Sequence, residues 1–342
     1  MELFGANTAV LERVAKELGE SPYRGKQLAE WIYKKQVTEF SVMSNLPDHF
    51  REELEATSSI SRSKIILSRS SADETTKYLL ELSDGQQIES VLIPSSDRVT
   101  VCVSTQVGCA VGCSFCATGT GGFVRNLTAG EIVDQVLTLE SEGGRRVTNV
   151  VYMGMGEPLL NYDSVLQSVR LLNNEVGIAM RKITISTVGV TPRIRQLESE
   201  NLQLTLAVSL HAPDNTLRRQ LIPLAGRYSL HSLIIACREY AEGTGRRITY
   251  EYLLIDKVND TDAHARELVS LLQGSLANVN LIPYNAVPGK GYRRPQQSRV
   301  NSFKAILERA GIETTQRMER GHTISAACGQ LKAQTQGKKN RI

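Results

Sequence analysis

The stretch from residue 100 to residue 116 reads TVCVSTQVGCAVGCSFC, and it decides the fold that we predict for this chain. Residues 100–104 are β-branched or small, and they predict a strand. The loop directly after this strand carries Cys109, Cys113 and Cys116. Ligating side chains that follow a strand are typical of active sites at the carboxyl ends of a parallel sheet.

The spacing C-x-x-x-C-x-x-C indicates an iron–sulfur cluster, because such clusters require thiolate ligands. Three cysteines hold three irons of a cubane, which leaves the fourth iron open to a substrate or cofactor. A structural zinc site is the alternative. Zinc needs a fourth Cys or His in a compact pattern, and the sequence has neither a second cysteine pair nor histidines at ligand spacing. The spacing therefore favours a cluster.

From residue 100 onward, predicted strands alternate with predicted helices. Thr128 and Glu131 form a capping box that opens a helix over residues 132–140, and Pro192 stands at the first position of another helix. Roughly six βα units imply a parallel sheet, which right-handed crossovers curl into a barrel or part of one. We therefore predict an α/β fold with a partial (βα)6 barrel. Its strands are expected at residues 100–104, 147–153, 182–186, 204–209, 247–254, 279–282 and 313–317.

The first ninety or so residues follow a different pattern. Apolar residues at helical spacing predict one helix from Val10 to Leu18 and another over residues 25–35. Asp84-Gly85 predicts a β-hairpin between residues 77–83 and 86–94, and the Ser-rich stretch 57–71 is interpreted as a connector. We expect an N-terminal accessory domain of helices plus a hairpin, a core domain and a C-terminal segment with a basic tail, at residues 1–94, 95–320 and 321–342.

Composition excludes several classes of protein. The 342 residues include 22% charged residues, an ordinary share for a globular protein and too low for a disordered one. No apolar run approaches the roughly 18–20 residues of a membrane span, and no secretory signal is visible, so we expect a cytoplasmic protein without a membrane partner. Its six cysteines then lie in a reducing compartment, where metal binding or redox chemistry is favoured over a disulfide scaffold. The net charge of +4 permits a nucleic-acid partner without indicating one.

Several blocks of sequence resemble a known family. The run CAVGCSFC at residues 109–116 is typical of radical S-adenosylmethionine (SAM) enzymes. More specific blocks are VSTQVGC at 103–109, RNLT at 125–128, MGMGEPLL at 153–160, SLHAP at 209–213, IPYN at 282–285, and the end from RGH at 320–322 to CGQL at 328–331. Over about residues 20 to 331, the chain is identified as a member of the RlmN/Cfr family of RNA adenine methyltransferases. The loops CSFC at 113–116 and GGFVRN at 121–126 are closer to RlmN, which methylates adenine C2, than to Cfr, which methylates C8.

The resemblance implies a cofactor site. The three cysteines would hold a [4Fe–4S] cluster whose open iron chelates SAM. From the residues alone, His211 is more often a loop histidine that satisfies a backbone group, and the glycines before Glu157 are by default a plain turn. The family positions that bind SAM match Gly156, Glu157, Ser186, Ser209, Leu210, His211 and Asn285, which follow predicted strands.

The resemblance also implies catalytic residues outside the cysteine loop. Cys328 matches the cysteine that carries a methyl group taken from a first SAM, and Cys102 matches the thiol that later resolves it through a transient disulfide. Glu89 matches the proposed proton acceptor. From the residues alone, Cys102 and Cys328 are more often structural, and Glu89 on the hairpin is a solvated strand residue. Cys237, on a helix between Leu233 and Ala241, is predicted to lie in the core.

The implied reaction consumes two SAM molecules, because C2 of adenine is too electron-poor to attack a methyl group directly. The implied substrates are adenosine 2503 of 23S rRNA and adenosine 37 of certain tRNAs. The implied partners are those RNAs and an electron donor such as flavodoxin or ferredoxin, and the implied state is a monomer. Three alternatives stay open at this point. They are Cfr-type C8 methylation, a radical SAM enzyme acting on a peptide or protein, and a non-enzymatic iron–sulfur or zinc RNA-binding protein.

Overall fold

The computed structural model describes residues 1–318, 320–321, 324–327 and 329–331, and it arranges ten of their strands in one mixed sheet. The strand order is β1-β2-β3-β4-β7-β8-β9-β10-β11-β12. From β4 onward every neighbouring pair is parallel, which confirms the predicted barrel strands. These strands are β4 (Val99–Cys102), β7 (Asn149–Tyr152), β8 (Ile183–Thr187), β9 (Thr205–Ser209), β10 (Ile248–Leu254), β11 (Ala277–Pro283) and β12 (Glu313–Gln316).

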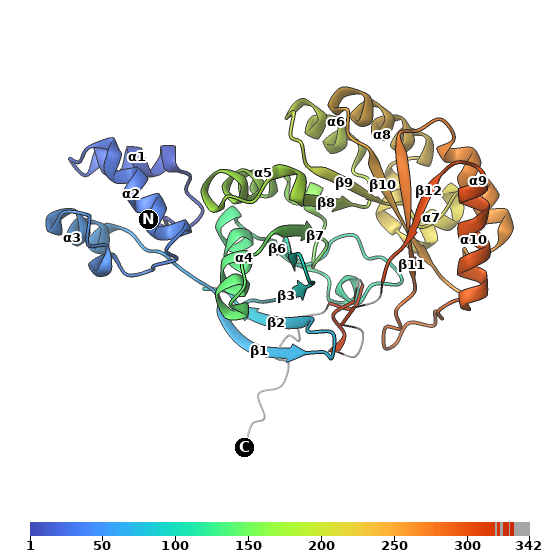
Figure 1. Cartoon of the computed structure of the whole chain (residues 1–342), viewed down its shortest axis with the longest axis horizontal. Coiled ribbons are helices and arrows are strands. Elements are labelled where there is room, and N and C mark those ends of the chain that lie inside the picture. Colours follow the sequence, from blue (N-terminus) through green and yellow to red (C-terminus); the bar gives the residue numbers. More distant parts are fainter. Residues whose placement is uncertain (319, 322–323, 328, 332–342) are drawn as a thin grey trace, which may run out of the picture.

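Helices join the parallel strands and cover one side of the sheet (Figure 1). The capping box forms as predicted, since Glu131 N donates to Thr128 Oγ1 at 3.1 Å and Thr128 N donates to Glu131 Oε2 at 2.8 Å. Within the described part of the chain, no helix combines the length and apolarity needed to cross a bilayer. The helices are α4 (Ala129–Gly143), α5 (Tyr162–Leu171), α6 (Thr191–Ser199), α7 (Asn215–Leu221), α8 (Leu230–Thr244), α9 (Asp262–Leu272) and α10 (Gln297–Arg309).

The core lies between these helices and the sheet. Every second residue of the central strands is fully buried, which is the period that a strand imposes on its two faces. On the helix side, Cys237 is 1% exposed, so the prediction that it lies in the core is confirmed. The strand residues that fill the core include Val150, Ile185, Leu206, Val208, Tyr250, Val279 and Leu281.

The predicted hairpin continues the barrel sheet rather than standing apart from it. Its strands β2 (Thr76–Glu81) and β3 (Gln87–Pro94) are antiparallel, and β3 pairs with β4. The interpretation of residues 57–71 as a connector is wrong, because seven of these residues form β1 (Lys64–Ser70). As an edge strand, β1 is almost wholly exposed, so its sequence shows no apolar alternation. The expected domain boundary near residue 94 stays a prediction.

Three helices form an N-terminal module beside α4 and α5 (Figure 1). Thr8 Oγ1 donates to Glu175 Oε2 at 2.7 Å, and Gln167 Nε2 donates to the carbonyl of Gly5 at 2.8 Å. At the closest approach, a Cβ on Gly130 of α4 would lie only 2.4 Å from the carbonyl oxygen of Phe4. The module therefore docks backbone against backbone. Its helices are α1 (Thr8–Glu17), α2 (Pro22–Tyr33) and α3 (Asp48–Thr57).

We expect Gly130→Ala to lower the free energy of unfolding by about 1–3 kcal/mol, because the new methyl group overpacks this contact. The sign of this change in the free energy of unfolding distinguishes overpacking from helix propensity. Without a close contact, alanine in a helix stabilises by about 1 kcal/mol relative to glycine. Urea unfolding followed by circular dichroism measures the change. Gly291→Ala is the matched control, because its Cβ would meet nothing within 4 Å. A Gly130→Ala protein as stable as the wild type would contradict the close docking.

Candidate active site

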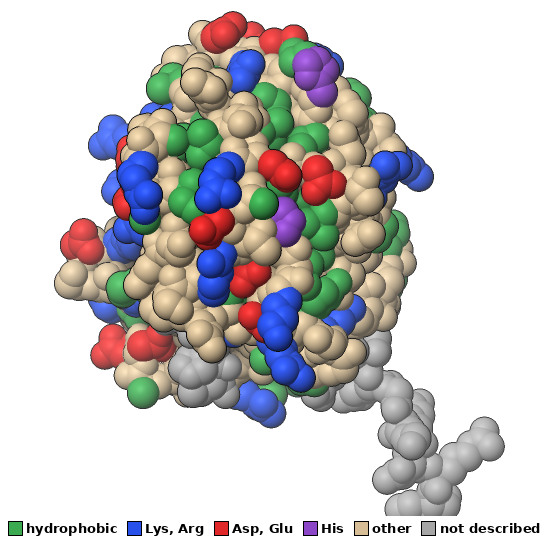
Figure 2. Space-filling model, turned by 90° about the vertical axis from the view of Figure 1, so that its right-hand side faces the viewer, with side chains coloured by type: hydrophobic (Ala, Val, Ile, Leu, Met, Phe, Trp, Pro, Cys, Tyr) green, Lys and Arg blue, Asp and Glu red, His purple; other side chains and the backbone are tan. Residues whose placement is uncertain are grey.

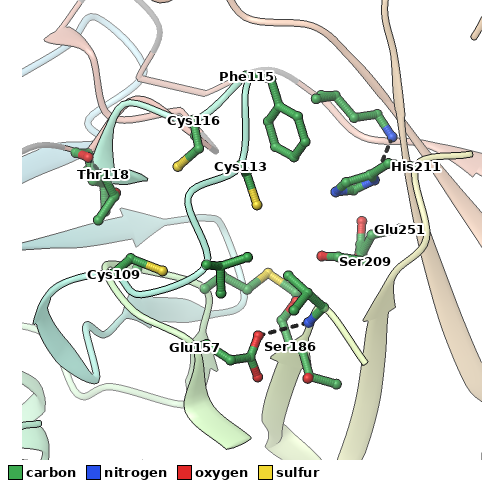
Figure 3. A pocket seen from close by; sticks show the side chains of 18 of the residues that line it. Cys109, Cys113, Phe115, Cys116, Thr118, Glu157, Ser186, Ser209, His211 and Glu251 are labelled. Carbon is green, nitrogen blue, oxygen red and sulfur yellow. Dashed lines mark hydrogen bonds between the residues drawn. The ribbon is translucent and has the colours of Figure 1, made fainter. Parts of the chain in front are cut away.

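A cavity of about 150 Å³ lies at the carboxyl ends of the parallel strands. Side chains from the cysteine loop and from several strand ends surround it (Figure 3). Among the described residues that line it, Leu210 and Asn285 do not appear, so the structure brings together only part of the predicted SAM site. The predicted residues that do line it are Cys109, Cys113, Cys116, Gly156, Glu157, Ser186, Ser209 and His211.

Leu210 and Asn285 nevertheless lie next to the cavity. Leu210 is fully buried in the core, and its backbone N–H donates to the carbonyl of Glu251, which lines the cavity. Asn285 directly follows Tyr284, another lining residue, and is 7% exposed. Its Oδ1 atom is buried and has no hydrogen-bond partner among the described residues. Because buried polar atoms are almost always satisfied, this oxygen suits a polar ligand that binds at the end of β11.

The cysteine loop is braced by a small ribbon that the sequence analysis missed. Strands β5 (Gln106–Gly108) and β6 (Phe123–Asn126) form this separate antiparallel pair. Gly108 has φ of +76°, and a Cβ there would lie 2.0 Å from the carbonyl oxygen of Gly122, so only glycine fits. The N–H of Cys109 donates to that same carbonyl at 2.8 Å. Two glycines before residue 123 were the available signal for this turn.

The three cysteines surround one space (Figure 3). Within the described residues, no group of three His, Cys, Asp or Glu side chains is placed to hold a single metal ion. Burial raises the pKa of Cys109 to about 11 and raises that of Cys113 well above its ordinary value. Thiols with a raised pKa of this kind become thiolates only with nearby positive charge, such as iron. The donor set therefore fits a multi-iron cluster better than one zinc ion.

Glu157 links two strand ends while it faces the cavity (Figure 3). Its Oε2 accepts from the N–H of Val188 at 2.8 Å, and its Oε1 accepts from the N–H of Leu159 at 3.0 Å. Burial raises the pKa of this carboxyl group. Gly156 before it has φ of +107°, and a Cβ there would lie 2.6 Å from Thr105 Oγ1. The glycine is therefore required both for the turn and for the close packing, and Glu157 keeps lone pairs for a cationic ligand.

The surroundings of His211 agree with both of its interpretations, as a loop histidine that satisfies a backbone group and as a residue of the SAM site. Its Nδ1 accepts a hydrogen bond from the N–H of Leu253 at 3.1 Å, and its ring packs edge-on against Phe115 at 5.1 Å. Burial, together with the nearby charge of Arg218, lowers the pKa of His211 to about 3. The imidazole is therefore neutral at pH 7. It satisfies a backbone group and also forms part of the cavity wall.

Glu251 of β10 and Arg317 after β12 line the cavity, and the sequence analysis missed both. Burial raises the pKa of Glu251, an effect that the charge of Arg317 opposes. Asn280 Nδ2 donates to Glu251 Oε2 at 2.9 Å. A carboxylate in the strand ITYEYLL, which is otherwise apolar or β-branched, was the signal that could have identified this position.

A second cavity of about 540 Å³ adjoins the first, and both are lined by Met153, Ile282, Arg317 and Leu331. Cys102 lines this second cavity. None of the described residues around it carries a carboxylate. On the outer face drawn in Figure 2, by contrast, Lys and Arg side chains lie among Asp and Glu side chains. The inner wall is therefore locally basic. Its cations are Arg98, Arg294, Arg317 and Arg320.

The remaining predicted residues are Glu89 and Cys328. Glu89 is only 6% exposed, so its interpretation as a solvated hairpin residue is wrong. Its position on the inner face of a strand that continues the barrel explains the burial. Cys328 lies outside the described residues, so its role and its pairing with Cys102 stay predictions. Of its neighbours, Ala327 lines the second cavity and Gly329 lines the first.

We expect Glu157→Gln to lower the free energy of unfolding by about 1–3 kcal/mol, because the amide would turn a donor toward one of two backbone donors. SAM binding, measured by equilibrium dialysis, should weaken by about tenfold through loss of the charge. The exposed Glu267→Gln on α9 is the control. Unchanged stability together with unchanged SAM affinity would contradict this role.

Comparisons with known proteins agree with this geometry. Residues 103–269 match the family model described as the radical SAM superfamily. Residues 1–60 match the model described as the ribosomal RNA large subunit methyltransferase N-terminal domain, and this range covers the N-terminal helical module.

Relatives extend over nearly the whole chain. A protein of Thermosynechococcus vestitus named "Probable dual-specificity RNA methyltransferase RlmN" is 50% identical, over 97% of this chain and 98% of that protein. A protein of the same name from Synechocystis is 52% identical, over 92% of this chain and 90% of that protein. The crystal structure of a radical SAM methyltransferase from Sphaerobacter thermophilus superposes with a TM-score of 0.93 at 47% identity, over 97% of this chain and 99% of that one. The chain therefore belongs to the RlmN family of radical SAM methyltransferases, which implies a [4Fe–4S] cluster and SAM.

Proposed function

We propose that this protein methylates C2 of adenine in RNA, at adenosine 2503 of 23S rRNA and at adenosine 37 of certain tRNAs. The observation that carries the proposal is the pair of adjoining cavities. One is lined by the cysteine triad, and the other by Cys102 and a group of arginines. Residue 328 lies in sequence between Ala327, which lines one cavity, and Gly329, which lines the other. In this proposal Cys328 is the methyl carrier.

In this proposal the first cavity is the cofactor site. Cys109, Cys113 and Cys116 would hold the [4Fe–4S] cluster, and the surrounding strand ends would hold SAM. When bound, the cluster and SAM would supply the one-electron cleavage that removes a hydrogen atom from a methyl group. Glu157 faces this cavity as an acceptor for the ammonium group of SAM, and Asn285 Oδ1 is a buried acceptor without a partner among the described residues. Gly156 lets the backbone approach the ligand closely.

The two further cysteines divide the methyl transfer into steps. The thiolate of Cys328 takes a methyl group from one SAM, and S-adenosylhomocysteine leaves. Removal of a hydrogen atom from this methyl would take a second SAM, so each turnover would consume two. The resulting carbon radical adds to C2 of adenine and joins the RNA covalently to Cys328. The surplus electron of the adduct would return to the cluster, which would have given one electron for the cleavage of SAM.

Release of the product needs a base and a second thiolate. Glu89 accepts the proton from C2. The thiolate of Cys102 then attacks the sulfur of Cys328, so that an S–S bond forms as the S–C bond breaks. The electron pair of the broken bond passes to the methylene carbon, which takes a proton and becomes the methyl group. A thiol reductant of the cytoplasm reopens the disulfide.

The arginine-lined cavity supports an RNA substrate in this proposal. Arginine pairs well with phosphate, and the target base must leave its stack to reach a buried site. The N-terminal accessory domain and the basic C-terminal tail would add contacts to the RNA backbone. A low-potential donor such as flavodoxin or ferredoxin would supply the electron to a monomeric enzyme.

Nucleoside mass spectrometry tests the reaction itself. We expect 2-methyladenosine in both rRNA and tRNA after anaerobic incubation with reconstituted protein, SAM and a reductant. 8-Methyladenosine would replace the proposal with C8 chemistry. SAM cleavage without any methyladenosine would refute the RNA substrate.

We expect Cys102→Ala to accumulate RNA that is covalently attached to the protein, because the adduct forms but no thiolate releases it. A gel shift that nuclease treatment collapses measures this species. Cys237→Ala is the matched control, since Cys237 lies in the core away from both cavities. Absence of an adduct in Cys102→Ala under turnover conditions would remove Cys102 from the mechanism.

A further inference from the structure

An ion pair between a half-buried lysine and a buried glutamate connects Glu89 to the C-terminal segment. Lys77 Nζ lies 3.0 Å from Glu89 Oε1, and the same ammonium group donates to the carbonyl oxygen of Ser325 at 3.2 Å. The side chains of Lys77 and Glu89 are 13% and 8% exposed. Lys77 therefore contacts two elements that lie nearly 250 residues apart in sequence. The mechanism proposed above gives this lysine no role.

The strand register brings Lys77 and Glu89 to the cavity side of the sheet. Between β2 and β3, Lys77 lies opposite Val91 and Leu79 lies opposite Glu89. Between β3 and β4, Val91 lies opposite Cys102. Opposite residues, and residues two apart on a strand, share a face, so Lys77, Glu89 and Cys102 do so as well. Cys102 lines the second cavity, which places the ion pair beside the proposed reaction chamber.

The hairpin also holds the segment that leads to residue 328. Gly321 N donates to Asp73 Oδ2 at 3.3 Å, and Arg320 Nη1 donates to the carbonyl of Pro94 at 2.6 Å. A Cβ on Gly321, whose φ is +64°, would lie 2.9 Å from the side chain of Thr75. The turn before β2 and the end of β3 therefore fix one part of this segment. Among these contacts, only that of Lys77 also reaches Glu89.

The two contacts of Lys77 fix the position of the Glu89 carboxylate. A general base must lie within hydrogen-bond reach of the proton that it removes, so the placement of Glu89 Oε1 matters for the proposed step. The lysine ammonium lies 3.0 Å from that oxygen and 3.2 Å from the carbonyl oxygen of Ser325, so one charged group contacts both.

We propose that Lys77 is a positioning residue, which ties the carboxylate of Glu89 to the docked C-terminal segment through Ser325. The base is then in place only when the segment that carries the methylated cysteine is docked. This inference rests on the proposed function, in which Glu89 removes the C2 proton.

Lys77→Met is the direct test, made in the full-length, cluster-loaded protein with a tRNA substrate. We expect formation of 2-methyladenosine to slow by at least about tenfold, within the range that general bases contribute. The covalent protein–RNA adduct should accumulate, while 5′-deoxyadenosine in the first turnover stays near the wild-type level. Lys77→Arg should restore most of the rate, because it keeps the charge and a donor. Lys64→Met, at an exposed position of β1, is the matched control.

A double-mutant cycle separates this role from a merely structural one. In a Glu89→Gln background, Lys77→Met should have little further effect, because the lysine acts through the carboxylate. An additive loss, or a slow Lys77→Met protein without adduct, would overturn the inference. Wild-type protein that makes no 2-methyladenosine would instead refute the proposed function. Adduct in Cys102→Ala but not in Lys77→Met would support the proposed function and would reject only the role proposed for Lys77.

Discussion

Parallel pairing from β4 to β12 is the constraint on which the rest of the structure depends. In a parallel sheet all carboxyl ends meet at one edge, so residues far apart in sequence converge without any local motif. The cysteine loop after β4, Glu157 after β7 and Ser209 at the end of β9 line one cavity for this reason. The antiparallel hairpin extends the same sheet beyond β4. It thereby adds Lys77 and Glu89 to a face that the barrel strands alone would not provide.

The two cavities separate tasks that would interfere in one chamber. A reactive radical is best kept apart from other groups, and the cavity with the cysteine triad is the smaller of the two. An RNA base and its phosphates need a larger, basic space, and the arginine-lined cavity is suited to that. Arg317 and Met153 line both cavities, so the wall between them is only about one side chain thick.

Sequence patterns predicted the barrel strands well because most of them are short runs of apolar or β-branched residues with turn signals on both sides. Sequence patterns failed where contacts with the rest of the fold determine the local structure or the burial of a residue. The edge strand β1 is exposed, and the ribbon strand β5 is three residues long, so neither shows a periodic pattern. Glu89 and Glu251 look like surface residues until the sheet that buries them is known. The family blocks identified most lining residues, but Lys77 belongs to no such block, and only its contacts reveal it.

The ribbon of β5 and β6 belongs to a sheet of its own, apart from the ten barrel strands. The half-buried cysteines that follow β5 pack against a smaller hydrophobic cluster, which includes Phe115, Leu253 and Tyr284. The main hydrophobic core, formed by the barrel strands and their helices, does not include these cysteines. Maturation of the enzyme can therefore occur in two stages, in which the chain folds first and the cell's iron–sulfur assembly machinery then delivers the cluster to a finished apoprotein.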